Sequence, residues 1–178
     1  MKFKKFIFKK VNSTNLTAIN ILKKTKLNYG MIVADLQSKG KGQYGRKWIS
    51  IKGNLFVSFF YNLDKIDLSL KKLTKLNCNL VKKTISNFYK KKIIFKEPND
   101  LLINGKKICG ILQETIYKKE NKFLVIGIGI NILKNPVILD YPTTNLCEIT
   151  GKNIKKNDVE KLLKFNFEKK FYNYFRNK

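Results

Sequence analysis

A carboxylate and an ammonium on one predicted hairpin are the strongest chemical signal in this chain. Residues 96–114 read KEPNDLLINGKKICGILQE. The Asn-Gly at 104–105 is typical of a two-residue type I′ turn, in which both central positions need a positive φ. Folding the second strand onto the first lets Asp100 and Lys107 face each other across the hairpin. Such a pair suits a site for phosphate and a metal, and it equally suits an ordinary cross-strand ion pair.

A glycine-rich stretch at 37–48, QSKGKGQYGRKW, is the second candidate. Its three glycines let backbone N–H groups approach an anion, and its four basic side chains add positive charge. Trp48, the only tryptophan, can stack on an aromatic ring or fill the core. The stretch is not a Walker A loop, because no Gly-Lys-Ser/Thr precedes a helix. A flexible surface loop explains the same residues.

Two further patterns allow a functional and a structural interpretation. Glycine within the apolar strand ending Gly127-Ile128-Gly129-Ile130-Asn131 weakens the strand unless something must come close. That neighbour can be a ligand, with Asn131 offering its amide, or a tightly packed helix. Ser13-Thr14-Asn15 stands at a predicted helix start, where capping accounts for one residue and a small polar ligand can occupy the others.

The net charge of +26 comes from 38 basic residues, of which only two are arginine. Nucleic acid or an anionic substrate is the functional interpretation. Lysine, asparagine and isoleucine are enriched together, as an AT-rich coding sequence would produce, and the lysines are spread along the whole chain. The spread favours a compositional origin, although the positive field still attracts ATP and acidic proteins.

The chain contains no histidine and three well-separated cysteines. A histidine general base and a Ser-His-Asp triad are therefore excluded, and a zinc site is disfavoured. Isolated cysteines in apolar surroundings are expected to be reduced core residues of a cytosolic protein. No apolar run approaches the roughly 20 residues of a membrane span, and the N-terminal apolar stretch is too short for a signal peptide.

These residues must be positioned by a fold that the apolar periodicity indicates. The chain has 178 residues, a length that suits one domain over 1–178. Consecutive strands dominate the middle of the chain, which favours an α+β fold with one mixed, largely antiparallel sheet and helices packed on one side. The expected strands are 3–11, 31–36, 54–61, 93–96, 101–104, 107–117 and 123–132, and the expected helices are 14–26, 68–91 and 158–175, the last capped by Asn157 or Asp158.

In order along the chain, these motifs resemble the catalytic domain of biotin protein ligases. The resemblance covers roughly residues 11–150 and implies the class II aminoacyl-tRNA synthetase/biotin ligase-like fold. Enzymes of that family join biotin to ATP as biotinyl-5′-AMP and pass biotin to a lysine of a carboxylase carrier domain. The motifs are Ser-Thr-Asn at 13–15, Gln-x-x-Gly-Lys-Gly-x-x-Gly-Arg-x-Trp at 37–48, Gly-Asn-Leu at 53–55, Lys-x-Pro-Asn-Asp-Leu at 96–101, Lys-x-x-Gly-Ile-Leu at 107–112 and Gly-x-Gly-Ile-Asn at 127–131.

The resemblance implies roles for individual residues. The implied catalytic residues are Lys107, Asp100 and Arg46, with Mg²⁺ expected near Asp100. Residues that resemble the biotin-binding set are Ser13, Thr14, Asn15, Gln37, Gly40, Lys41, Lys107, Gly127 and Gly129. Those that resemble the nucleotide-binding set are Gly42, Gly45, Arg46, Trp48, Asn99, Asp100 and Asn131.

The resemblance also sets expectations about substrates, partners and departures. ATP and biotin are the implied substrates, and the partner is the acidic biotin carboxyl carrier protein of acetyl-CoA carboxylase. A membrane or nucleic acid is not expected to be a partner, and a homodimer stays open. Glu97 replaces the family's usual tryptophan and Lys41 its first loop arginine, which is not an equivalent phosphate ligand.

The sequence shows neither a helix-turn-helix before the domain nor a small β-barrel after it, so a repressor role is not expected. The missing barrel and the departures leave full activity open. The alternatives are a lipoate-type acyl ligase of the same superfamily, a basic nucleic-acid-binding protein and a catalytically degenerate domain.

Overall fold

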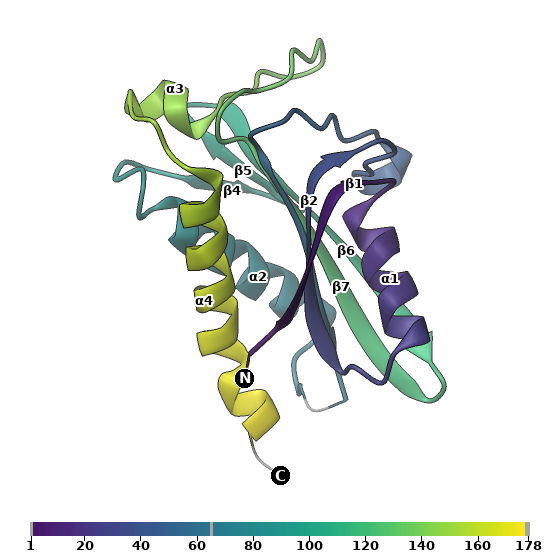
Figure 1. The fold of residues 1–178 in the computed structure, drawn as a ribbon. Helices are drawn as coiled ribbons and strands as arrows, with labels where there is room; N and C mark the ends of the chain where they lie inside the picture. The colour runs from purple at the N-terminus through teal and green to yellow at the C-terminus, as the bar shows by residue number, and fades with distance from the viewer. Residues whose placement is uncertain (1, 65, 177–178) are drawn as a thin grey trace.

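The computed structural model describes residues 2–64 and 66–176 and has one mixed sheet at its centre (Figure 1). Its strand order is β1-β2-β3-β7-β6-β5-β4; β1 and β2 are parallel and all other neighbours are antiparallel. The expectation of an α+β fold with a mixed, largely antiparallel sheet is confirmed. The strands are β1 (Lys4–Val11), β2 (Tyr29–Gln37), β3 (Leu55–Asn62), β4 (Ile94–Lys96), β5 (Asp100–Ile103), β6 (Lys106–Lys118) and β7 (Asn121–Ile130); the helices are α1 (Thr14–Lys24), η1 (Gln43–Gly45), α2 (Leu70–Ile85), α3 (Leu146–Thr150) and α4 (Lys156–Arg176).

The helices cover both faces of the sheet, contrary to the expectation of one side. Figure 1 shows α1 on one face and α2 with α4 on the other. β3 shows the physical reason, because both of its faces are apolar: Phe59 and Tyr61 pack with the larger core, whereas Phe60 packs with α1. Side chains alternate across a strand, so a strand with large apolar side chains on both faces needs cover on each face.

The larger core lies between the sheet and the pair α2 and α4, and aromatic rings dominate it. Phe59 of β3 stacks on Phe167 of α4 with ring centroids 4.2 Å apart and planes 4° apart. Tyr61 lies against Phe171 at 4.5 Å, and all four side chains are fully buried. This aromatic layer holds α4 on the sheet through apolar burial and ring contacts.

Several expected boundaries differ from the observed ones. α2 ends at Ile85 instead of continuing to residue 91, and the short helix α3 lies between residues 132 and 158, where no helix or strand was expected. α4 begins at Lys156, so neither Asn157 nor Asp158 is its N-cap; Asp158 lies in the first turn. Asp158 there still complements the positive end of the helix dipole.

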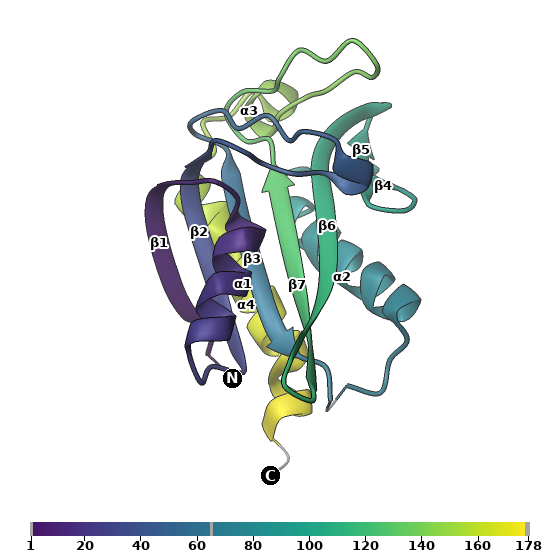
Figure 2. The ribbon, with the colours of Figure 1, turned by 90° about the vertical axis from the view of Figure 1, so that its right-hand side faces the viewer.

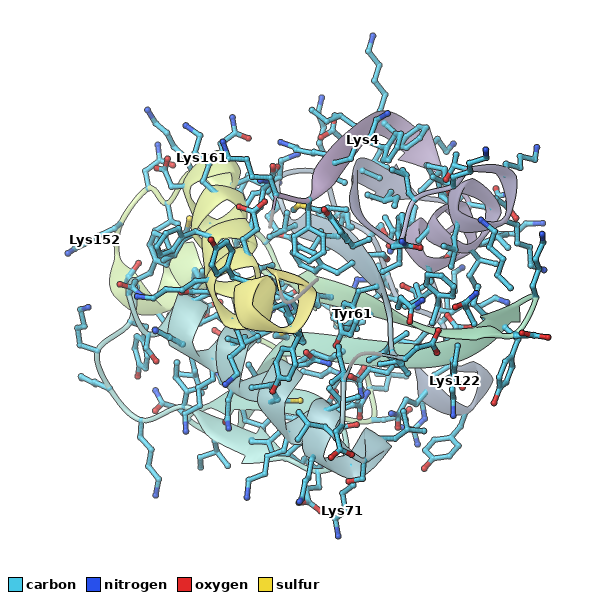
Figure 3. All side chains as sticks on the ribbon, turned by 90° about the horizontal axis from the view of Figure 1, so that it is seen from below. Lys4, Tyr61, Lys71, Lys122, Lys152 and Lys161 are labelled. Atoms are coloured by element: carbon cyan, nitrogen blue, oxygen red, sulfur yellow. The ribbon has the colours of Figure 1, made fainter. Side chains whose placement is uncertain are left out.

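The basic side chains surround the molecule. Figure 3 shows Lys4, Lys71, Lys122, Lys152 and Lys161 extending outward from different sides, whereas Tyr61 lies within the molecule. This arrangement agrees with the spread of lysine along the sequence and differs from a single cationic stripe. No helix in the described part of the chain is long and apolar enough to cross a membrane.

We predict that Phe167→Ala lowers the free energy of unfolding by about 3–5 kcal/mol, because it leaves a cavity beneath Phe59. Phe165→Ala is the matched control two positions away, since Phe165 is 56% exposed and should change stability by about 0.5 kcal/mol or less. Urea denaturation followed by circular dichroism measures both. Equal losses in the two variants would contradict the assignment of Phe167 as a core anchor.

Candidate functional site

A cavity of about 280 Å³ opens on the α1 face of the sheet, at one end of β6 and β7. Further along the same face, Phe123 and Val125 of β7 pack under α1. At the cavity the strands carry Gly127, Gly129 and Gly110 instead. Because residues two apart share a face, the glycines remove the side chains that would otherwise fill this space.

Other groups do come close to the backbone at these glycines, and they are side chains of this protein. A Cβ on Gly129 would lie 2.3 Å from the Trp48 ring, and one on Gly110 would lie 2.6 Å from it. A Cβ on Gly127 would lie 2.4 Å from Asn15 Oδ1. The glycines therefore seat Trp48 and Asn15 against the sheet, and these two side chains then line the cavity.

The Asp100–Lys107 pair forms as the hairpin pattern predicts. Asn104 and Gly105 have φ of 49° and 74°, as a type I′ turn requires. Lys107 Nζ lies 2.9 Å from Asp100 Oδ1, with both side chains at least four-fifths buried. That oxygen accepts no hydrogen bond from the described residues, so the contact is an ion pair without directed hydrogen-bond geometry. The hairpin reaches this point after a cis Glu97–Pro98 bond.

Two aromatic rings complete the surroundings of the Lys107 ammonium. Its Nζ lies 5.5 Å from the Trp48 ring centroid and 5.0 Å from that of Tyr141. Contacts at this distance attract a cation to the ring face. The sequence did not single out Tyr141, because it lies in an irregular segment with no motif or periodicity around it. Gly110 belongs to the Lys-x-x-Gly-Ile-Leu motif but was not predicted as a site residue, because only the strand pairing places it opposite Gly129.

At the other end of the cavity, the start of α1 presents polar groups. Ser13 is the N-cap and accepts from the Leu16 N–H at 3.5 Å. Thr14 donates from its backbone N–H and its hydroxyl to Gln37 Oε1, at 2.8 and 3.0 Å. Capping therefore explains one residue of the motif, and the Thr14–Gln37 contact brings two distant predicted residues together.

Asn15 is held from both sides of its amide. Its Nδ2 donates to Glu114 Oε2 at 2.6 Å, and Ser58 Oγ donates to its Oδ1 at 2.6 Å. Asn15 and Ser58 are buried. Glu114 and Ser58 thus fix the orientation in which Asn15 meets the cavity, and neither was identified from the sequence.

The glycine-rich segment forms a small ordered turn at the mouth of the cavity. Figure 2 shows the connection between β2 and β3 crossing the end of the sheet toward β5. Lys41 pairs with Lys47 as an isolated bridge, and Tyr44 occupies the tip with φ 55° and 89% exposure. The segment brings cationic side chains to the mouth, as the anion-binding interpretation requires.

Most of the predicted site residues meet at this one cavity, and three do not. Gly40 lies behind it, where a Cβ would meet the Trp48 carbonyl oxygen at 2.7 Å. Gly45 has φ +75° at the exposed turn. Asn131 is buried and donates to the Thr144 carbonyl at 3.1 Å, so its amide supports the segment after β7. Those that line the cavity are Ser13, Thr14, Asn15, Gln37, Lys41, Gly42, Arg46, Trp48, Asn99, Asp100, Lys107, Gly127 and Gly129.

The thiols near the site are not nucleophiles. Burial raises the pKa of Cys78 to about 12, and the Asp100 carboxylate adds to the shift. Burial also raises the pKa of Cys109 well above its usual value. Both thiols are free and stay protonated at neutral pH, in agreement with the expectation of reduced core cysteines. No group of three or more Cys, Asp or Glu side chains among the described residues could hold a metal by itself.

A model of the biotin/lipoate A/B protein ligase family matches residues 7–131. The chain belongs to this family. A Bacillus subtilis relative named bifunctional ligase/repressor BirA is 31% identical over 172 residues, covering 92% of this chain and 52% of the relative. Biotin–protein ligase 2 of Arabidopsis thaliana is 32% identical over 145 residues, covering 70% of this chain and 43% of the relative.

Among solved structures, the biotin protein ligase from Aquifex aeolicus in complex with biotin and ATP superposes with a TM-score of 0.80. The two sequences are 29% identical, and the superposition covers 98% of this chain and 72% of the Aquifex chain. The chain spans about half the length of the curated relatives it matches. The chain therefore has the fold of that ligase along nearly its whole length.

We predict that Gly129→Ala displaces the Trp48 ring, because a methyl group has no room against it. The emission of the sole tryptophan should shift to the red, and stability should fall by about 1–3 kcal/mol. Gly42→Ala is the control, since its nearest neighbouring atom would lie at 3.4 Å. An unchanged spectrum in Gly129→Ala would contradict the seating of Trp48 on this glycine.

Proposed function

We propose that this protein is a biotin–protein ligase, which activates biotin with ATP and transfers it to a lysine of a biotin carboxyl carrier protein. The observation that carries the proposal is a single cavity with polar groups at one end and a lysine–aspartate pair at the other. A ligand with a polar ring and a carboxylate matches both ends. Membership of the family and the likeness to a ligase bound to biotin and ATP support the same reaction.

In the first step, a biotin carboxylate oxygen attacks the α-phosphorus of ATP, and pyrophosphate leaves. The product is the mixed anhydride biotinyl-5′-AMP. Two anions must approach each other in this step, so the protein must offset their repulsion and align them. Lys107 does so from within the cavity and Arg46 from its mouth, and neither needs to act as a nucleophile.

In the second step, the ε-amine of an acceptor lysine attacks the acyl carbon, an amide forms and AMP leaves. The attacking amine must first lose a proton. Asp100 is the carboxylate that holds this amine near the anhydride, because it lines the same cavity as Lys107. The same carboxylate fits Mg²⁺, which takes one or two carboxylates together with substrate phosphates. When bound, Mg²⁺ would neutralise phosphate charge beside Asp100.

The carrier partner is proposed from the same electrostatics. Lys41, Arg46 and Lys47 surround the mouth of the cavity. An acidic carrier domain would be attracted to this mouth. The free, buried thiols also fit a reducing compartment such as the cytosol.

In the deciding experiment, the purified chain is incubated with biotin, ATP, Mg²⁺ and a biotin carrier domain. A streptavidin blot then detects biotin on the carrier. Pyrophosphate release is measured in parallel with biotin and with lipoate. Biotin-dependent pyrophosphate release and a labelled carrier are the expected results. Release with lipoate alone would point to a lipoate-type ligase, and no release with either acid would exclude the proposal.

We predict that Lys107→Ala lowers the rate of biotin-dependent pyrophosphate release at least about 100-fold, because it removes the cation that stabilises the developing charge. Lys106→Ala is the matched control on the neighbouring, exposed position and should keep wild-type activity. Circular dichroism checks that both variants fold. Near-normal turnover in Lys107→Ala would mean that another cation stabilises the transition state.

A further inference from the structure

The segment that follows β7 returns to the site and forms hydrogen bonds with the backbone of Lys107. The Lys107 N–H donates to the Pro142 carbonyl at 2.9 Å, and the Thr144 N–H donates to the Lys107 carbonyl at 3.0 Å. Asn131 Nδ2 donates to the Thr144 carbonyl at 3.1 Å and ties this segment to the end of β7. Residues 142–144 therefore form a strap along β6 at the position of Lys107.

The strap is itself held by side-chain hydrogen bonds at its base. Asn135 Nδ2 donates to Thr143 Oγ1 at 2.9 Å, and Asn145 Nδ2 donates to Asn135 Oδ1 at 2.7 Å. Pro142 restricts the backbone of the residue before it to extended conformations. Tyr141 is therefore placed next to a hydrogen-bonded segment, and Pro142 restricts its backbone.

Tyr141 acts on the side chain of the same lysine. Its ring centroid lies 5.0 Å from Lys107 Nζ, and the Trp48 ring centroid lies 5.5 Å from the same atom. Asp100 is the ammonium's charged partner, and the Lys107 side chain is 14% exposed. Three side chains from three separate segments thus surround one ammonium group.

The three contacts differ in what they leave free for a substrate. A carboxylate neutralises the ammonium, whereas the face of an aromatic ring attracts it without cancelling its charge. Trp48 rests on two glycines without backbone pairing to Lys107, whereas Tyr141 directly precedes the strap that binds the Lys107 backbone. Tyr141 is therefore the contact that can hold the ammonium in place while its full charge stays available.

We propose that Tyr141 is a positioning residue, which holds the Lys107 ammonium in the cavity through the face of its ring. The inference rests on the proposed function, in which Lys107 offsets the charge of the reacting carboxylate and phosphate. It extends the site to a residue outside the predicted motifs and gives the strap a role in the first step.

The test replaces the ring or changes its charge distribution, and it measures biotin-dependent ATP–pyrophosphate exchange. Tyr141→Leu should lower kcat/KM for biotin about five- to tenfold, and Tyr141→Phe should stay within about twofold of wild type. Pentafluorophenylalanine at position 141 keeps the ring but reverses its quadrupole, and it should behave like Tyr141→Leu.

Tyr117→Leu is the matched control, because the Tyr117 ring makes the same kind of contact with Lys122 at 5.8 Å, away from the cavity. It should leave the exchange rate unchanged. Wild-type exchange in Tyr141→Leu would overturn the proposal. Equal loss in Tyr141→Phe would assign the effect to the hydroxyl group, and full activity with the fluorinated ring would assign it to packing; either result overturns it.

A second measurement separates this proposal from the proposed function. An amine-reactive ester labels lysines, and peptide mass spectrometry follows Lys107 and Lys106 separately in the full chain. Tyr141→Leu should raise the labelling rate of Lys107 severalfold, while the exposed Lys106 keeps its rate. Faster Lys107 labelling without any exchange in wild type would retain the positioning role and reject the ligase, whereas unchanged labelling would reject the positioning role.

Discussion

The site depends on one steric constraint: glycine must occupy three positions of the paired strands β6 and β7. On the same face of the sheet, Phe123 and Val125 fill the space beneath α1. Where Gly127 and Gly129 replace such side chains, Asn15 and Trp48 come to rest on the backbone. A cavity forms there because the strands continue through positions that carry no side chain. The sheet thus supplies rigidity and the glycines supply room.

The cavity is positively charged overall, because cationic side chains outnumber carboxylates along its lining. Asp100 is ion-paired with Lys107, and the cationic side chains of the glycine-rich segment gather at the mouth. Burial keeps the thiols of Cys78 and Cys109 protonated beside this charge. Such a site stabilises anions and contributes no nucleophile, which is what the condensation of a carboxylate with a nucleotide requires. Glu97, at the cavity rim, is the unusual charge among these cations.

The polar end of the cavity depends on hydrogen bonds between side chains of separate segments. Ser58 and Glu114 orient the amide of Asn15, and Gln37 is engaged by Thr14. These bonds come from three strands and one helix, so the polar end of the cavity is ordered before any ligand arrives. Prior ordering of this kind lowers the entropy lost on binding.

The sequence by itself determined the strands, the three long helices apart from their exact boundaries, the Asn104-Gly105 turn and the Asp100–Lys107 contact, because these depend on local periodicity and on a two-residue turn. It also indicated most of the residues around the cavity, through motifs whose order along the chain is distinctive. The sequence could not show which face of the sheet each helix covers. α1 lies on the face opposite α2 and α4, because β3 has apolar side chains on both of its faces.

Only the tertiary structure decided what lies against each glycine and what surrounds Lys107. Asn131 carries a motif, yet its amide supports the strap, whereas Tyr141 carries no motif and lies on the lysine. Contacts between segments far apart in the chain leave no periodic trace in either segment. The chemistry of the residues is therefore readable from the sequence, but which of them share one cavity depends on strand pairing and packing.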